Sequence, residues 1–295
     1  MANKHVNTEV LAEQNRAIGW QSGFSEVVFK GLDLLVRNTG RGLKSRLRMM
    51  VPRQLKKHRI LAGPLRGAWI VTSWQHYHTG ILGTVEPGLI AWIKKTALPG
   101  ETWLDIGANY GYTALAMRRQ VGPEGRVFAF EPKLSTCGCL SQTMRLNRLP
   151  EVTAVPMGLG SAETLEMIQL TAVGGMVAKN TKVGGTAVAE SVESITVARL
   201  DWLWPQICGS RPRIDGVKID VQGMELDVLR GMKGILETHK PKLVVEVHDG
   251  VDRNKLLDLL EECGYSRRGK PIYTVPGEES EPQYFDNLSY AFTAR

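Results

Sequence analysis

The residues best suited to chemistry begin at Asp105, which is followed by two glycines in the spacing Asp-x-Gly-x-x-x-Gly. An apolar run just before them predicts a buried strand over 102–106, and a helix is expected from about Tyr112. Gly107 and Gly111 let the backbone approach a ligand closely. A dinucleotide-binding turn has the spacing Gly-x-Gly-x-x-Gly instead. The turn therefore favours S-adenosylmethionine (SAM) over NAD.

A second acid, Glu131, ends the next predicted buried strand, 24 residues after Gly107. In doubly wound sheets, an acid about 20 residues past the glycine turn holds the ribose hydroxyls of an adenosine. One carboxylate can accept both hydrogen bonds. A Glu that is only solvated is the alternative, but the ordered pair of motifs predicts a nucleotide cofactor.

Three further groups follow later predicted strands, at the edge where open sheets bind ligands: Asp220, Glu246 and His248. Carboxylates suit the sulfonium cation of SAM. Methyl transfer to a hydroxyl benefits from a general base, and His248 has the reference pKa best matched to pH 7. The alternatives are that His248 only caps a loop, that Asp220 or Glu246 is the base, or that positioning alone supplies the rate.

A divalent metal held by Asp220, Glu225 and Glu246 is a further hypothesis that we do not favour. Glu225 begins a predicted helix, where an acid more commonly complements the helix dipole. Lys218 lies inside a predicted strand and is expected to be buried or paired. The four cysteines have neither the spacing of a zinc site nor that of a disulfide framework, so no metal ligand is assigned.

The segment from about Gly80 to Gly264 resembles the FkbM family of class I SAM-dependent methyltransferases over nearly two thirds of the chain. Five segments carry the resemblance in order: 105–111, 130–132, 217–225, 241–248 and 264–265. Gln222 stands where the family most often has Glu. The resemblance implies O-methylation of a hydroxyl on a sugar, a glycan or a polyketide-like acceptor.

The resemblance also implies roles for individual residues. Asp105 and the backbone of the glycine turn would hold the methionine portion, Glu131 the ribose, and the region around Gly158 would border the adenine. The cofactor-binding residues are thus expected to be Asp105, Gly107, Ala108, Asn109, Tyr110, Gly111, Glu131, Pro132, Gly158 and Asp220. Related chains have an acid at the position of Glu86, so Glu86 and the nearby aromatic Tyr77 join Asp220, Glu246 and His248 as expected catalytic residues.

These residues require a fold that brings strand ends together. Apolar runs predict strands near 102–106, 126–130, 152–156, 216–221 and 242–247, with helices near 112–121, 134–147, 225–236 and 252–262. That alternation is typical of an α/β, doubly wound, mostly parallel seven-stranded sheet. Segments 272–275 and 289–293 are expected to pair antiparallel, 63–72 to form a hairpin-like lead-in, and the glycine-rich stretch 173–185 to be a lid.

Charge is concentrated near the N-terminus, with eleven basic residues and one acid between Lys30 and Arg66. The whole chain carries +7, so the remainder carries −3. We expect a basic helical arm over 1–62 and a methyltransferase domain over 63–295. The arm could be solvated, form a homodimer contact or lie on an anionic membrane; nucleic acid is less favoured. Without an apolar span or signal peptide, the chain is expected to be cytoplasmic, or peripheral at the inner membrane face.

Two other functions would use the same elements. An NAD-dependent sugar oxidoreductase would share the sheet and Glu131, although the glycine spacing opposes it. A non-catalytic SAM-binding module would have no need for the acids and the histidine at the later strand ends. Base N-methylation is disfavoured, because no Asn/Asp-Pro-Pro-aromatic motif follows the fourth strand.

Overall fold

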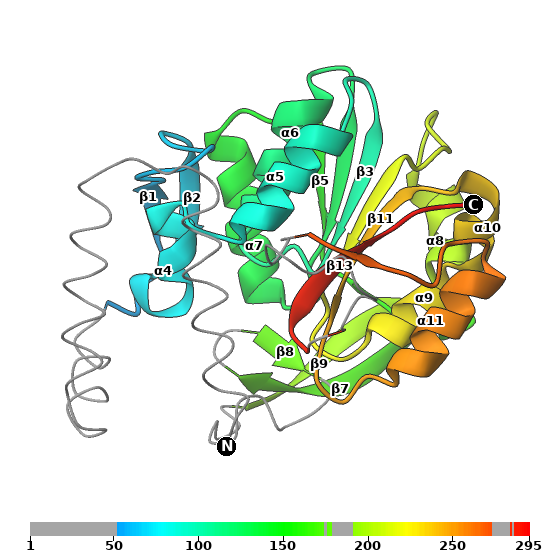
Figure 1. Cartoon of the computed structure of the whole chain (residues 1–295). Helices are drawn as coiled ribbons and strands as arrows, with labels where there is room; N and C mark the ends of the chain where they lie inside the picture. The colour runs from blue at the N-terminus through cyan, green and yellow to red at the C-terminus, as the bar shows by residue number, and fades with distance from the viewer. Residues whose placement is uncertain (1–51, 174–175, 179–190, 273–283, 285) are drawn as a thin grey trace.

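The computed structural model describes residues 52–173, 176–178, 191–272, 284 and 286–295 (Figure 1). Its largest sheet has the strand order β12-β13-β11-β10-β3-β4-β5. From β11 to β5 all neighbours are parallel, whereas β13 is antiparallel to both of its neighbours. The strands are β3 (Thr102–Ile106), β4 (Arg126–Phe130), β5 (Val152–Val155), β10 (Gly216–Ile219), β11 (Lys242–Val247), β12 (Lys270–Pro271) and β13 (Leu288–Phe292). The expected mostly parallel seven-stranded sheet is confirmed.

Helices cover both faces of this sheet, as in a doubly wound fold (Figure 1). One face packs against α4 (Trp74–Leu82), α5 (Pro87–Thr96), α6 (Tyr112–Val121) and α7 (Leu134–Leu146). The other packs against α8 (Leu200–Ile207), α9 (Glu225–Gly231), α10 (Lys233–His239) and α11 (Arg253–Glu262). The helix expected over 225–236 is therefore two helices, which meet at Met232.

The alternation of side chains along the central strands decides where the charged residues lie. In β3, Leu104 and Ile106 join the core beneath α8–α11, whereas Trp103 joins the core beneath α4–α7. Asp105 has the same parity as Trp103 and so belongs to the α4–α7 side. Its register partner on β10 is Lys218. The fold thereby puts these two charged side chains next to each other on one buried face.

A second, four-stranded sheet with order β6-β9-β7-β8 was not predicted from the sequence. It comprises β6 (Gly158–Leu159), β7 (Leu165–Val173), β8 (Met176–Ala178) and β9 (Ser191–Ala198). Ile195 and Val197 of β9 pack against Met224. Within the stretch 173–185, which was expected to be a lid, the structure describes the last residue of β7 and the whole of β8. Residues 174–175 and 179–185 lie outside the described residues, and the lid stays a prediction.

An antiparallel hairpin of β1 (Lys56–Arg59) and β2 (Trp69–Thr72) precedes α4. The expected lead-in is present, but the expectation of helix up to about residue 60 is wrong for 56–59. These residues pair along their length with β2, and the Arg59 guanidinium lies 3.8 Å from the centroid of the Trp69 ring. The hairpin crosses the expected boundary at residue 62. The rest of the expected arm, residues 1–51, lies outside the described residues.

The C-terminal antiparallel pairing joins β13 to β12 at 270–271, just before the expected segment. The Ile272 N–H still donates to the Ser289 carbonyl at 3.2 Å, while 273–275 lie outside the described residues. Within the described part of the chain, no helix has the length and apolarity that crossing a membrane requires.

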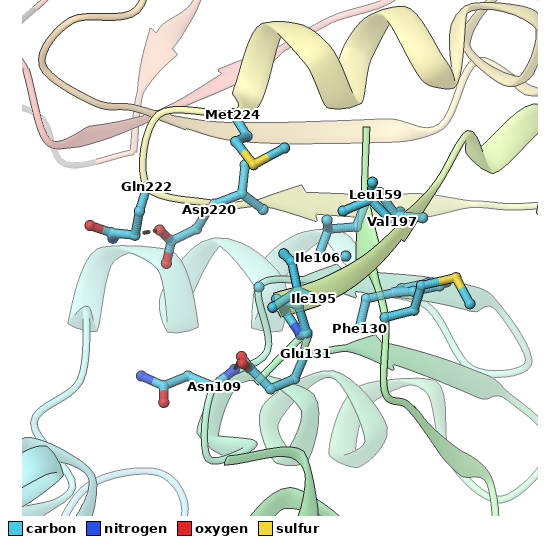
Figure 2. A pocket seen from close by; sticks show the side chains of 15 residues that line it. Ile106, Asn109, Phe130, Glu131, Leu159, Ile195, Val197, Asp220, Gln222 and Met224 are labelled. Carbon is cyan, nitrogen blue, oxygen red and sulfur yellow. Dashed lines mark hydrogen bonds between the residues drawn. The ribbon is translucent and has the colours of Figure 1, made fainter. Parts of the chain in front are cut away.

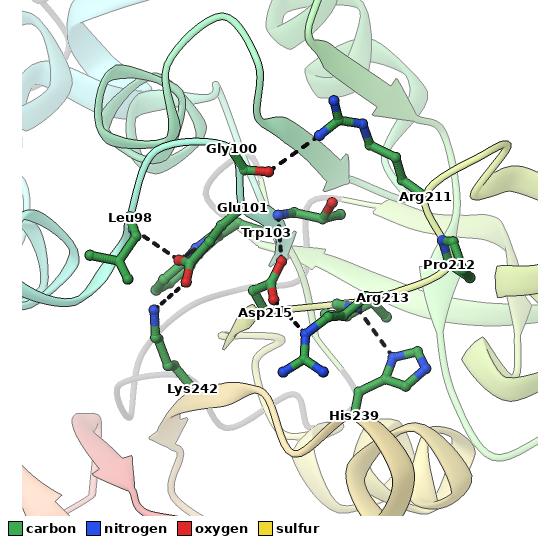
Figure 3. A network of polar contacts seen from close by, with 12 residues as sticks. Leu98, Gly100, Glu101, Trp103, Arg211, Pro212, Arg213, Asp215, His239 and Lys242 are labelled. Atoms are coloured by element: carbon green, nitrogen blue, oxygen red, sulfur yellow. Dashed lines mark hydrogen bonds and ion pairs between the residues drawn. The ribbon is translucent and has the colours of Figure 1, made fainter.

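A polar network fastens the amino-terminal ends of the central strands (Figure 3). The Glu101 carboxylate accepts from the Trp103 indole at 2.9 Å and pairs with the Lys242 ammonium. Asp215 accepts from the Thr102 N–H, also at 2.9 Å. All of these groups have partners that hold β3, β10 and β11 together. The side chains that are expected to do chemistry follow the opposite, carboxyl ends of the strands.

Candidate active site

A pocket opens at the carboxyl ends of β3, β4 and β10, beneath β9 of the smaller sheet (Figure 2). Its polar groups come from Asn109, Glu131, Asp220 and Gln222. Its apolar walls come from both sheets and from the loop before α9: Ile106, Phe130, Met157, Leu159, Ile195, Val197, Val221 and Met224, with Gly107, Pro132 and Gly158 completing the lining. An apolar wall beside a few carboxylates suits a ligand that joins an apolar ring to hydroxyl groups, such as a nucleoside.

Glu131 follows β4 and is held by two backbone donors. One carboxylate oxygen accepts from the Asn109 N–H at 2.9 Å, the other from the Lys133 N–H at 3.0 Å. Each oxygen keeps a lone pair for a further hydrogen bond. Burial raises the pKa of Glu131 to about 7 in spite of these two bonds. The carboxylate is thus fixed in place and able to accept from a pair of hydroxyls.

The glycine turn between β3 and α6 is shaped by contacts within the protein. Gly107 has φ +82°, and a Cβ there would lie 1.8 Å from the Asp220 carbonyl oxygen, so only glycine fits. The N–H groups of Gly107 and Ala108 both donate to the Phe130 carbonyl, at 3.0 and 2.9 Å. The Gly111 N–H donates to Ala108. These three backbone N–H groups already donate within the protein, so a ligand would contact the surface of the turn and not these donors.

Asp105 does not line the pocket. Its side chain is fully buried, and one oxygen lies 3.2 Å from the Lys218 ammonium. The same ammonium lies 3.3 Å from Asp220 and donates to the Gly107 carbonyl at 3.0 Å. Burial opposes the charge on Lys218, but the carboxylates of Asp105, Asp220 and Glu86 outweigh it and raise the pKa of Lys218. Lys218 was expected to be buried or paired, and it is both.

The predicted cofactor residues thus separate into two groups. The pocket is lined by Gly107, Asn109, Glu131, Pro132, Gly158 and Asp220. The remaining four, Asp105, Ala108, Tyr110 and Gly111, do not line it, and Ala108 and Tyr110 belong to the core beneath α4–α7. Tyr110 packs its ring 5.4 Å from that of Tyr77. These four residues shape the turn and its support.

Three of the predicted catalytic side chains come together beside the pocket. Nε2 of His248 lies 3.6 Å from an oxygen of Asp220 and 3.4 Å from an oxygen of Glu246. Ile219 pairs with Val245 in the sheet, so Asp220 and Glu246 follow as neighbours on adjacent strands. Asp220 also lines the pocket, so the same carboxylate lies beside both the expected cofactor site and the imidazole.

The second ring nitrogen of His248 contacts Glu225, a residue that was not expected to be catalytic. Nδ1 of His248 lies 2.6 Å from a carboxylate oxygen of Glu225, which is fully buried. Burial acts to lower the pKa of His248, but the hydrogen bond to Glu225 and the charge of Asp220 outweigh it, so that this pKa is raised. The dipole explanation of Glu225 misses this contact, because residues 23 positions apart meet only in the fold.

Glu86 and Tyr77 approach the same cluster from the α4–α5 side. Glu86 hydrogen-bonds to Glu246, and burial, with the nearby charge of Asp220, raises the pKa of Glu86 to about 7. The same two causes raise the pKa of Glu246. Burial raises the pKa of Tyr77 well above its ordinary value. Asp220 differs: burial opposes its charge, but Lys218 and His248 prevail and lower its pKa.

Asp220, Glu246 and His248 each offer one donor atom within 4.8 Å of the others, a spacing that a cation could bridge. Against this, the Lys218 ammonium already lies beside Asp220. The Gln222 amide nitrogen also lies 2.9 Å from Nε2 of His248, on the side that a cation would need. We therefore assign no metal ligands here.

Sequence reasoning missed the wall formed by Ile195 and Val197. The signal was present, since polar and apolar residues alternate from Ser194 to Val197 in the period of a half-buried strand. It also missed the Gln222 amide as a partner of His248.

Comparison with known proteins was made with this geometry in hand. Residues 105–267, more than half of the chain, match the family model described as the Methyltransferase FkbM domain. A similar curated protein is the hexuronic acid methyltransferase AglP of Haloferax volcanii, 29% identical over 181 residues, covering 61% of this chain and 70% of that protein. Methyltransferase 1 of Beauveria bassiana is 27% identical over 179 residues, covering 55% of this chain and 71% of that protein.

Among solved structures, the methyltransferase FkbM of Methylobacillus flagellatus is similar, with 18% identity and a TM-score of 0.44. The alignment covers 72% of this chain, which spans about half (51%) of the length of that protein.

Proposed function

Since the chain belongs to the FkbM methyltransferase family, we propose that it transfers the methyl group of SAM to a hydroxyl oxygen of a sugar or glycan. The observation that carries the proposal is the position of Asp220. This carboxylate lines the same pocket as Glu131, and it lies 3.6 Å from the imidazole of His248. Cofactor pocket and base are thus adjacent.

The chemistry of the lining residues supports SAM as the ligand of this pocket. Glu131 would accept from the ribose hydroxyls, and the apolar walls around Gly158 and Val197 would enclose the adenine. The side-chain oxygen of Asn109 is buried and has no hydrogen-bond partner among the described residues, which leaves it free for a ligand donor. When bound, SAM supplies an activated methyl group on a sulfonium cation.

In the proposed reaction the acceptor oxygen forms a bond to the methyl carbon as the carbon–sulfur bond breaks, leaving a neutral thioether. The hydroxyl proton passes to Nε2 of His248. Glu225 and Asp220 then stabilise the imidazolium through their negative charge. Glu246 and Glu86, which share a hydrogen bond, would accept hydrogen bonds from further hydroxyls of the acceptor.

A saccharide acceptor is supported by the name of the Haloferax volcanii relative, a hexuronic acid methyltransferase. The carboxyl groups of Asp220, which lines the pocket, and of Glu246 and Glu86 in the adjoining cluster also suit a molecule rich in hydroxyl donors.

The test is transfer of labelled methyl from SAM to a panel of nucleotide sugars, lipid-linked glycans, hexuronic acids and polyols. With an accepted substrate, His248→Ala should lower kcat by about 100-fold or more while SAM affinity stays unchanged. His239→Ala is the matched control, because that imidazole lies at the other end of β10, bonded to the Ile214 N–H. Full activity of the His248 variant would remove it as the base.

A chelator arm separates the metal alternative. We expect transfer to continue in EDTA, because the Lys218 ammonium already supplies positive charge beside Asp220. Activity that disappears with EDTA and returns with magnesium would instead support a metal held by the Asp220 cluster.

A further inference from the structure

His248 sits directly after β11, and one partner lies nearest to each ring nitrogen, with Glu246 and Asp220 farther from Nε2, at 3.4 and 3.6 Å. Nδ1 lies 2.6 Å from the Glu225 carboxylate, and Nε2 lies 2.9 Å from the side-chain nitrogen of Gln222. The ring is buried, and Glu225 is fully buried. Which nitrogen of a histidine carries the proton is set by such partners.

An ionised carboxylate only accepts hydrogen bonds, so the nitrogen that faces Glu225 must carry hydrogen. The same Glu225 oxygen also accepts from the Gly223 N–H at 3.1 Å, which fixes its position at the start of α9. The Gln222 amide nitrogen only donates, so the nitrogen that faces it must present a lone pair. Both partners therefore specify the same form of the ring.

We propose that Glu225 and Gln222 act as positioning residues that hold neutral His248 in the tautomer with hydrogen on Nδ1 and a lone pair on Nε2. The catalytic meaning of this inference rests on the proposed function, because the lone pair on Nε2 is the one that would take the acceptor's proton. The tautomer itself is a property of the free protein. It can be tested without any acceptor.

Gln222 is held in this position by an unusual backbone. Its φ is +53°, in the left-handed region that residues other than glycine seldom adopt, and Gly223 follows with φ +99°. The amide also approaches Asp220 at 3.4 Å (Figure 2). One side chain thus contacts both the imidazole and a residue that lines the pocket. An acceptor hydroxyl entering the site would replace this amide as the donor to Nε2.

The neutral amide also sets the charge around the ring. The charged groups that act on His248 from β10 and α9 are Lys218, Asp220 and Glu225. Asp220 and Glu225 favour the imidazolium and Lys218 opposes it, while Glu246 on β11 lies 3.4 Å from Nε2 with its own pKa raised by burial. A further carboxylate at position 222, the residue most common in the family, would favour the imidazolium more and leave less neutral base near pH 7. Gln222 therefore keeps the base available at lower pH.

Long-range ¹H–¹⁵N NMR of the full ¹⁵N-labelled chain tests the tautomer directly. We expect His248 to carry hydrogen on Nδ1. His239 is an internal reference of opposite type, because its Nδ1 accepts from the Ile214 N–H at 3.2 Å and its hydrogen must be on Nε2. Glu225→Ala should shift His248 toward hydrogen on Nε2 and leave the His239 signals unchanged, which also shows that the fold is intact.

Hydrogen on Nε2 of His248 in the unaltered protein would overturn the proposal, as would a tautomer that the double variant Glu225→Ala/Gln222→Met leaves unchanged. If the tautomer is found but His248→Ala keeps full turnover, the positioning stands and the proposed base is wrong. The two failures are therefore distinguishable.

A pH profile tests the charge argument. Gln222→Glu should move the acid limb of kcat upward by about one pH unit, so that activity at pH 6 falls about tenfold. Gln222→Met removes the donor without adding charge, and its acid limb should not move upward. Glu225→Gln keeps an acceptor for Nδ1 but loses the charge, and its limb should move downward. Equal profiles for all four proteins would overturn the role of these residues.

Discussion

The ammonium of Lys218 lies 3.2 Å from the carboxylate of Asp105, between two strands that pair these residues in register. Both side chains are almost completely buried. The acid of the glycine motif is therefore paired with a cation inside the protein, beneath the turn, and does not line the pocket. This geometry assigns Asp105 a structural task that its position in the motif does not reveal.

Removing one partner of this pair should be costly. Lys218→Met leaves Asp105 and Asp220 buried without their cation, and we expect the free energy of unfolding to fall by about 3–5 kcal/mol in urea titrations. Asp105→Asn should cost less, because Asp220 remains 3.3 Å from the ammonium. The double variant should lose less than the sum of the single losses.

The control for these single and double variants is Arg118→Met. Arg118 forms a 2.9 Å pair with Glu151 nearer the surface, and such pairs contribute about 0–1 kcal/mol. Full additivity of the Asp105 and Lys218 variants would contradict the pairing.

A second prediction concerns the ribose site. Glu131→Gln should weaken SAM binding by about 1–3 kcal/mol in calorimetry, because charge-assisted hydrogen bonds to the ribose are lost while the shape of the side chain is kept. Glu151→Gln makes the same change of charge outside the pocket and should leave SAM affinity as it was. Unchanged affinity in the Glu131 variant would remove the ribose assignment.

A third prediction follows from the raised pKa of Glu131, about 7 because of burial. Only the ionised carboxylate accepts from both hydroxyls, and the carboxyl becomes ionised as pH rises through that pKa. SAM affinity should therefore increase from pH 6 to pH 8 and level off above it. In Glu131→Gln this part of the pH dependence should be absent. A wild-type profile identical to that of the variant would contradict the assignment.

The fold was largely predictable because its central strands are short apolar runs that end in glycine turns or acids. Segments 102–106 and 126–130 are buried on both faces, so the runs are continuous and their ends are sharp. The strand over 56–59 was missed because three of its four residues are Lys or Arg and its stability comes from pairing with β2. Charge there indicated a solvated helix, and only the tertiary contact decides otherwise.

The candidate site was predictable only where it follows from strand ends. Parallel topology brings Asp220, Glu246 and His248 to one edge, as the sequence predicts. The partners of His248 depend on the path of the loop before α9, through residues with positive φ, which no periodicity reports. The division between residues that line the pocket and residues that support it likewise depends on which way each side chain of the glycine turn faces.

The last prediction concerns the basic segment 30–66, whose described part places Lys56 and Lys57 on the exposed strand β1. If it meets an anionic membrane surface, each basic residue contributes about 1 kcal/mol. Reversing the charge of Lys44, Arg46 and Arg48 to Glu should then lower partitioning to anionic vesicles by on the order of 100-fold or more. Sedimentation with vesicles measures it, and neutral vesicles serve as the control. Binding should also weaken with added salt, since the Debye length of about 8 Å at physiological ionic strength shortens further. Equal partitioning to both vesicle types would contradict membrane contact and favour a packing or dimer role for this segment.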